Sequence, residues 1–225
     1  MNCRRFTVSS NAKARLLKRA AVDILGGMTV NLGIGLPTEV LQYVSPSTPV
    51  CLHSENGIAG VGPVLSSEKA DRNLIDAGGA YVSCVPGTAF FDSAVSFAIV
   101  RSGRLDLSLL GAFQVAANGD LANWKIPGKF SPGMGGAIEL AQKARRVGVV
   151  MMHTDSKGNP KILSQCNLPL TAAGRVNRIY TDLAVFDVTA DGLYLREIAD
   201  GTSIAALEAV TGTAFHVPDQ DLPRF

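Results

Sequence analysis

A glutamate that follows an apolar run is the residue of this 225-residue sequence best placed to do chemistry. Glu55 comes directly after a predicted strand at residues 50–53 and Ser54, and it precedes Asn56 and Gly57, a pair typical of a tight turn. A carboxylate beside a buried strand costs free energy unless it has a partner or a role. Glu55 can be a general base, a nucleophile or a solvated neighbour of the turn, and the residue types leave all three open.

Two glycine-rich segments could present backbone amides, the first to an anionic or bulky ligand and the second to an oxyanion. Residues 31–35 read Asn-Leu-Gly-Ile-Gly, which lacks the third glycine of a dinucleotide fingerprint and the lysine of a P-loop. Residues 133–136 read Gly-Met-Gly-Gly at the head of a predicted helix, where amides can face an oxyanion formed by carboxylate attack on a carbonyl. Each segment is equally consistent with a simple turn.

Alternating strand and helix patterns predict the elements that position these residues. The predicted strands span 28–32, 50–53, 81–85, 105–115 and 147–153, and the predicted helices span 10–25, 39–43, 91–101, 137–144 and 203–210. Residues 182–188 and 193–198 form a hairpin across Asp191-Gly192. We therefore predict an α/β fold with an open, largely parallel sheet and an antiparallel edge, which binds ligands beyond the carboxyl ends of its strands.

The segment between residues 116 and 136 is rich in Gly, Asn and Pro and is long for a connection. Such long loops are uncommon in compact domains unless they carry function. We expect a functional loop there.

Composition narrows the class of protein. The formal net charge of +2 argues against a nucleic-acid binder, and 47% hydrophobic residues are enough for one core. We expect a single domain over residues 1–225, with peripheral tails at 1–10 and 218–225, no secretory signal and no membrane span. The mean hydropathy of +0.20 fits a surface partly covered by a partner.

The cysteines and histidines are scattered rather than paired. They are Cys3, Cys51, Cys84, Cys166, His53, His153 and His216. This spacing fits reduced thiols in a cytoplasmic protein and predicts no metal site. We interpret His53 only as the strand residue before Ser54, and no serine lies in a nucleophile-elbow motif.

Taken in order along the chain, the motifs resemble those of the β subunit of family I CoA-transferases, of the 3-oxoacid and 3-oxoadipate type. The matching motifs lie at residues 31–38, 54–57, 73–78, 90–94, 119–124, 133–137, 168–171 and 180–185. The run Ile58-Ala59-Gly60-Val61 departs from a more leucine-rich family pattern. The resemblance implies the open α/β fold of this family, which is NagB/RpiA-like.

The resemblance also implies roles for individual residues. Glu55 matches the nucleophile of a ping-pong CoA transfer through a glutamyl-CoA thioester, and Gly136, with Gly135 beside it, matches the oxyanion-stabilising position. Contacts to CoA are implied for a further set: Asn31, Gly33, Asn56, Asn123 and Lys129.

Partners and substrates follow from the same resemblance. The chain matches only the β part and lacks the Gly-Gly-Phe-Gly type loop expected of the α part, so we expect a separate α subunit and a hetero-oligomer. Coenzyme A enters as the acyl-CoA substrate, with no permanently bound cofactor. The loop at 125–129 favours succinyl-CoA and a 3-oxoacid such as acetoacetate, followed by 3-oxoadipate and then acetate or butyrate. A non-catalytic CoA-binding module and an acyl-CoA hydrolase are the alternatives from other classes.

Overall fold

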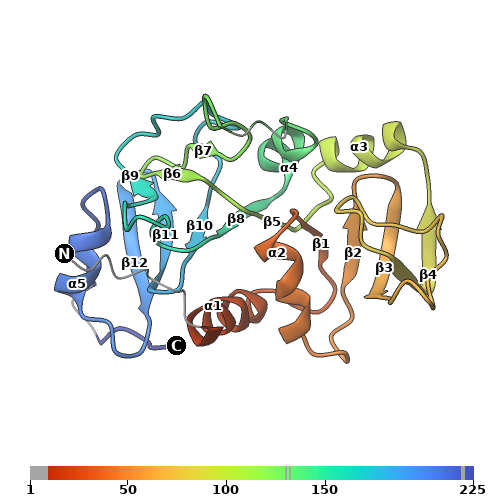
Figure 1. Ribbon diagram of the computed structural model, residues 1–225, viewed down its shortest axis with the longest axis horizontal. Coiled ribbons are helices and arrows are strands. Elements are labelled where there is room, and N and C mark those ends of the chain that lie inside the picture. The colour runs from red at the N-terminus through yellow and green to blue at the C-terminus, as the bar shows by residue number, and fades with distance from the viewer. Residues whose placement is uncertain (1–9, 130, 132, 219–220) are drawn as a thin grey trace.

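The computed structural model describes residues 10–129, 131, 133–218 and 221–225. The described residues build one nine-stranded sheet in the order β12-β11-β10-β8-β5-β1-β2-β3-β4, flanked by helices (Figure 1). Its five central strands are all parallel: β10 (Arg178–Tyr180), β8 (Arg146–Val150), β5 (Leu107–Leu110), β1 (Thr29–Leu32) and β2 (Cys51–Ser54). The predicted α/β fold with a largely parallel sheet is confirmed.

Antiparallel pairs close the sheet at both edges, not at one. The predicted C-terminal hairpin is confirmed as β11 (Ala184–Thr189) and β12 (Gly192–Ile198). At the other edge β3 (Ile58–Val64) pairs with β4 (Val82–Phe90), and β3 was not predicted. Gly60, Gly62 and Pro63 interrupt its pattern, because both residue types are disfavoured inside strands.

The helices cover opposite faces of the sheet. On one face α1 (Ser10–Val22) packs near α2 (Leu36–Glu39) and the 3-10 turn Val40–Tyr43. On the other face lie α3 (Ser93–Arg101) and α4 (Ala137–Lys143), and α5 (Ile204–Val210) lies beyond β12 (Figure 1). Asp92 caps α3 by accepting a hydrogen bond from the Val95 amide, which explains why this helix begins two residues after the predicted start at Phe91.

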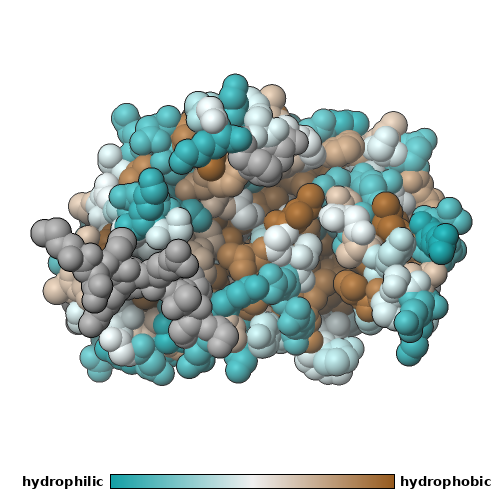
Figure 2. Space-filling model, viewed as in Figure 1, coloured by the Kyte–Doolittle hydropathy of each residue, from teal (hydrophilic) through white to brown (hydrophobic). Residues whose placement is uncertain are grey.

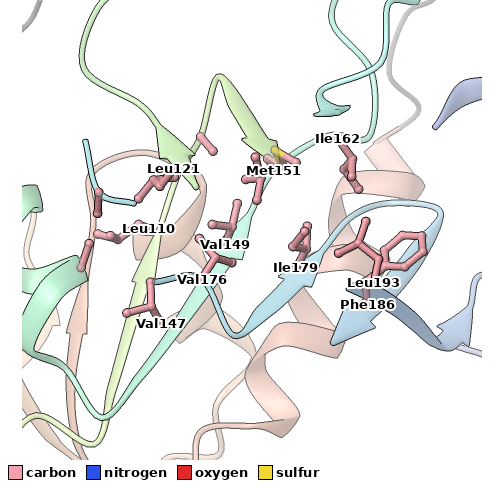
Figure 3. Packing of buried hydrophobic residues seen from close by; sticks show 14 of the residues in the cluster. Leu110, Leu121, Val147, Val149, Met151, Ile162, Val176, Ile179, Phe186 and Leu193 are labelled. Atoms are coloured by element: carbon pink, nitrogen blue, oxygen red, sulfur yellow. The ribbon is translucent and has the colours of Figure 1, made fainter. Parts of the chain in front are cut away.

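A second, three-stranded sheet lies over the α4 face. It has the order β7 (Leu121–Ala122), β6 (Gln114–Ala116) and β9 (Ile162–Leu163). Leu121 and Ile162 from it pack with Leu110, Val149 and Ile179 of the large sheet in one core (Figure 3). The two sheets thus share one hydrophobic core.

Several predicted elements were too long; the strand predicted at 147–153, for example, ends at Val150. The run at 105–115 divides after Leu110, where the chain leaves the large sheet and enters the small one; both halves are buried, so the apolar pattern did not reveal the break. The first helix ends at Val22 instead of Leu25, because the amides of Asp23 and Ile24 donate to carbonyls three residues back and tighten the last turn.

The end of the chain is part of the fold. Residues 221–225, which we expected within a peripheral tail, run beside β12: Arg224 pairs with Ile198, and Phe225 packs against the α1 core. The expected N-terminal tail lies outside the described residues, except Ser10, which begins α1. Within the described part of the chain, no helix is long and apolar enough to cross a membrane.

Candidate active site

Glu55 lies at the carboxyl end of β2, on the edge where the parallel strands end. Its carboxylate oxygen Oε2 accepts a hydrogen bond of 3.0 Å from Nδ2 of Asn31, which lies on the neighbouring strand β1. The same Nδ2 donates to the main-chain oxygen of His53, also at 3.0 Å. Asn31 is fully buried, so this amide fixes one oxygen of a half-buried carboxylate. Both segments that we expected at the carboxyl ends of strands, 31–35 and 54–57, therefore meet at one edge of the sheet.

Gly57 makes the turn around Glu55 possible. Its φ of +123° lies in a region that favours glycine, and a Cβ at this position would come within 2.0 Å of the Phe91 carbonyl oxygen. The Gly57 amide donates back to the Ser54 carbonyl at 3.0 Å, and the Gly57 carbonyl accepts from the Phe91 amide at 3.0 Å. The turn is therefore held against the start of α3.

The residues on each side of Glu55 hold the loop at 71–80. Ser54 Oγ accepts a hydrogen bond from the Ala77 amide, and Asn56 Nδ2 donates to the Ile75 carbonyl, both at 2.8 Å. Asn56 is exposed, with its amide nitrogen committed to this loop. The motif at 73–78 is thus brought to the active-site edge, although it lies about twenty residues away in the sequence.

Gly136 lies directly against Glu55. A Cβ placed on Gly136 would stand 3.3 Å from Glu55 Cγ and 2.9 Å from the Phe97 ring of α3. Gly136 has an ordinary φ of −74° and is the residue that precedes α4, so closeness and not backbone conformation demands glycine here. Gly135 differs: its φ is +49°, and nothing lies within 4 Å of where its Cβ would be.

The other residues predicted to contact CoA have different surroundings in the structure. Gly33 donates its amide to the Leu109 carbonyl at 2.8 Å and packs on Leu110. Asn123 is a clamp, since its Nδ2 donates to the Gly111 carbonyl (3.0 Å) and its Oδ1 accepts from Thr171 (2.6 Å). Lys129 is exposed, and its side chain makes no hydrogen bond or ion pair with a described residue.

His53 is the residue that the sequence interpretation missed. It is 4% exposed, and its Nε2 lies 3.0 Å from the hydroxyl of Ser96, a fully buried residue of α3. Its ring stacks on Phe91 at 6.2 Å between centroids. Burial lowers the pKa of His53, which the nearby Glu55 carboxylate opposes. The one signal available was its place two residues before Glu55.

Among the described residues, no group of three His, Cys, Asp or Glu side chains could hold a metal ion. Cys51 and Cys84 are exposed free thiols, and burial raises the pKa of the Cys166 thiol to about 11. The groups that the structure brings together at this site are Glu55, Asn31 and Gly136.

Comparison with known proteins decides the family. Residues 13–209 match the family described as Coenzyme A transferase. The chain belongs to this family. The beta subunit of a probable coenzyme A transferase from Bacillus subtilis is 47% identical over 199 residues, 88% of this chain and 92% of that protein. One subunit of a succinyl-CoA:3-ketoacid coenzyme A transferase from Helicobacter pylori is 44% identical, over 90% of this chain and 97% of that one.

Other relatives are longer. The human mitochondrial succinyl-CoA:3-ketoacid coenzyme A transferase 2 is 46% identical over 92% of this chain, which spans only 40% of the human protein. An acyl-CoA transferase from Escherichia coli O157:H7 has the same fold, with a TM-score of 0.77 at 21% identity over 95% of this chain and 43% of that one. The decarboxylase AibA/AibB also shares it, with a TM-score of 0.71 at 21% identity over 95% of this chain and 88% of that one.

Proposed function

We propose that this chain is the β subunit of a CoA-transferase that moves CoA from succinyl-CoA to a 3-oxoacid such as acetoacetate. The observation that carries the proposal is the position of Glu55, held by the Asn31 amide on one side and against Gly136 on the other. Relatives of nearly the same length with succinyl-CoA:3-ketoacid names support the substrate class. A decarboxylase with this fold shows that the fold alone does not fix the reaction.

The proposed mechanism is a ping-pong transfer on Glu55. A carboxylate oxygen attacks the acyl-CoA carbonyl carbon, the C–S bond breaks, and CoA thiolate leaves an acyl-glutamyl anhydride. The thiolate then attacks the Glu55 Cδ, and the C–O bond breaks to release the first acid and form a glutamyl-CoA thioester. The acceptor carboxylate repeats both steps in reverse order, so that no net proton or electron is transferred.

Each step passes through a tetrahedral oxyanion that needs preorganised donors. In attack on Glu55 Cδ, the Asn31 Nδ2 bound to Oε2 is placed to donate to that oxygen as its charge grows. Gly136, and Gly135 beside it, are the proposed oxyanion residues on the other side, because the lack of a side chain at Gly136 lets the main chain approach Glu55. CoA contacts remain proposals for Gly33, Asn56, Asn123 and Lys129.

A separate α subunit is part of the proposal. Two Bacillus subtilis relatives of similar length are named as single subunits, one of them as the beta subunit. The human enzyme, by contrast, has more than twice this length in one chain. Large apolar side chains are exposed in segments next to Glu55's loop contacts and at the β4 edge, including Ile34 (69%) and Phe90 (62%). Figure 2 shows apolar side chains gathered over α2 and the β2–β4 region. A partner can cover this surface.

Two other acceptors have support of different kinds. The beta subunit of an Escherichia coli acetate CoA-transferase is 44% identical over 92% of this chain, which favours acetate as the second candidate. The 3-oxoadipate reaction stays a proposal that rests on sequence resemblance alone. Coenzyme A is proposed as substrate without a resident cofactor, and the scattered cysteines make the cytoplasm the proposed compartment.

The experiment that tests this function is a covalent trap. The chain is coexpressed with its α subunit, incubated briefly with succinyl-CoA or acetoacetyl-CoA, and its intact mass is measured before and after borohydride reduction. We expect a CoA adduct that reduction removes, with the altered peptide mapping to Glu55. An active preparation with no adduct would overturn the thioester route, and CoA release at full rate without an acceptor acid would favour a hydrolase.

A further inference from the structure

Three buried polar side chains form a row across the sheet behind Glu55. His53 on β2, Asn31 on β1 and Ser108 on β5 are register partners on adjacent parallel strands. Residues in register on parallel strands project from the same face, and Ser108 lies on the face opposite that of Leu107 and Leu109, which pack toward α1. The row therefore faces α3 and α4, above β2, β1 and β5 in Figure 1. We call these three residues the polar row.

Each member of the polar row has one polar atom without a hydrogen-bond partner among the described residues. These atoms are His53 Nδ1, Asn31 Oδ1 and Ser108 Oγ. Asn31 and Ser108 are 0% exposed. Buried polar atoms in native proteins are nearly always bonded to protein or to ordered water, because an unmet atom loses its hydration without compensation. Three unmet atoms in register on neighbouring strands indicate a partner that the described residues do not supply.

The surroundings limit what this partner can be. The next residue in register beyond Ser108 is Val147, so the row ends at an apolar side chain. On the other side His53 Nε2 already faces the Ser96 hydroxyl. None of the three side chains is a carboxylate or a Lys or Arg side chain, so a small neutral molecule that both donates and accepts suits all three atoms.

The orientation of Asn31 shows what this partner would fix. Nδ2 faces two acceptors, the His53 carbonyl and the Glu55 carboxylate, so a flipped amide would set oxygen against oxygen. Oδ1 is consequently the atom that remains unmet. A partner on Oδ1 resists rotation of the amide, and the amide in turn fixes Oε2 of Glu55.

We propose that the polar row binds ordered water, and that this water site orients the nucleophile through Asn31. Strands lie about 4.8 Å apart, so atoms on register partners can share one water or a pair. Water can donate to Asn31 Oδ1, exchange roles with Ser108 Oγ, and serve either tautomer of His53. The evidence for the water site is the three unpartnered atoms of the polar row, whereas its effect on Glu55 rests on the proposed function. Ser108 is in this sense a positioning residue.

Ser108→Ala tests the water site through the sign of its effect. Loss of a hydroxyl that bonds to water lowers the melting temperature by about 2–4 °C, whereas loss of a truly unpaired hydroxyl leaves it unchanged or raises it. Ser66→Ala is the matched control, because Ser66 is exposed in a loop and is expected to change neither temperature nor turnover. A melting temperature that rises or stays the same in Ser108→Ala would overturn the proposal.

A second measurement observes the water directly. A crystal structure of the complete enzyme at about 2 Å resolution should show a water within about 3.2 Å of at least two of the three atoms. The absence of a water peak near these atoms in a well-defined map would refute the site, and so would a shift that pairs the atoms with one another.

Positioning of Glu55 is measured separately, as the rate of CoA-adduct formation. We expect a several-fold slower rate in Ser108→Ala with KM for the acyl-CoA unchanged, and an unaltered rate would remove the positioning role. A water observed in a protein that forms no Glu55 adduct would leave the water site intact and defeat the proposed function instead.

Discussion

Two buried histidines near the ends of parallel strands are satisfied in different ways. His153, which follows β8, is 1% exposed, and both ring nitrogens lie 3.0 Å from threonine hydroxyls, those of Thr181 and Thr211. His53, on β2, is almost as buried, yet only its Nε2 has a protein partner. Burial alone therefore does not distinguish the two.

The difference separates a region built for stability from a region built for chemistry. Thr211 also donates to the Leu207 carbonyl at 2.7 Å, and Thr181 Oγ1 accepts from the amides of Leu183 and Ala184 at 3.2 and 3.0 Å, so the network around a neutral His153 is closed. Around His53 the network is open at Nδ1 and at the adjoining Asn31 Oδ1. Closed networks contribute to folding, whereas unmet capacity concentrates at sites that bind something. Mutations in the closed network around His153 should consequently change stability, whereas mutations in the open network around His53 and Asn31 should change turnover.

The largest effect is expected at Glu55, which lies beside the open network of His53 and Asn31. Glu55→Ala should lower CoA transfer at least about a thousandfold, roughly 4 kcal/mol of barrier, because the proposed thioester forms on this carboxylate. Turnover with saturating succinyl-CoA and acetoacetate measures this, and the melting temperature should change little.

Glu39→Ala is the control for that variant. Glu39 is a partly exposed glutamate whose carboxylate pairs with Lys13 at 2.7 Å, and its loss should leave turnover intact. Transfer at the normal rate in Glu55→Ala would reverse the assignment of the site.

The closed network around His153 should govern how stability depends on pH. Burial, with a smaller contribution from Lys161, lowers the pKa of His153 to about 4, against about 6.5 in the unfolded chain. Between these values the unfolded chain binds a proton that the folded protein does not, so stability rises with pH across the window. We expect a loss of at most about 3 kcal/mol as pH falls from 6.5 to 4.

Urea midpoints at several pH values measure this loss. The pKa of His53 is lowered too, so His153→Leu should remove part of the slope and His53→Gln a further part. A slope identical in His153→Leu and the unmodified protein would contradict the assignment to His153.

His153→Leu should itself destabilise the fold at pH 7.5 by about 2 kcal/mol, since two buried hydrogen bonds to threonine hydroxyls are lost. Thermal melting measures this as a drop of about 4–8 °C. Turnover per folded molecule should be unchanged. His216→Leu, at an exposed histidine, is the control and should shift the melting temperature less.

The sequence predicted the open α/β sheet, whereas the roles of the site residues stay predictions. Glu55, Gly136 and Asn31 carry motifs whose spacing is visible along the chain, and the structure brings all three together. The hairpin at Asp191-Gly192 was visible in the sequence, because turn chemistry is local.

What remained hidden depends on contacts across the sheet. The polar row exists only because His53, Asn31 and Ser108 share a register, and Ser108 looks like one more residue of a buried strand. The division of the run after Leu110 is also invisible, since both daughter strands are buried. Asn123, predicted as a CoA contact, is tied to Gly111 and Thr171, which lie far from it along the chain.

The smallest effects are expected at Gly136 and Gly135, where alanine substitutions distinguish side-chain crowding from backbone strain. Gly136 has a φ that alanine tolerates, but the new Cβ would press on the Phe97 ring and on Glu55 Cγ. Gly136→Ala should therefore lower turnover roughly tenfold, about 1.4 kcal/mol, by displacing Glu55, with little change in melting temperature. Gly135→Ala adds a methyl group in open space at a φ of +49°, so it should mainly cost stability, about 1 kcal/mol.

Phe97→Leu provides the check on that interpretation. A smaller side chain at 97 makes room for the methyl group at 136, so the double variant should recover part of the lost turnover relative to Gly136→Ala. Recovery means that the ring forces the methyl group toward Glu55, because the Gly136 amide is unchanged throughout the series. If the double variant is as slow as Gly136→Ala, the loss comes from the main chain at Gly136 itself, and the proposed oxyanion role becomes the explanation of the effect.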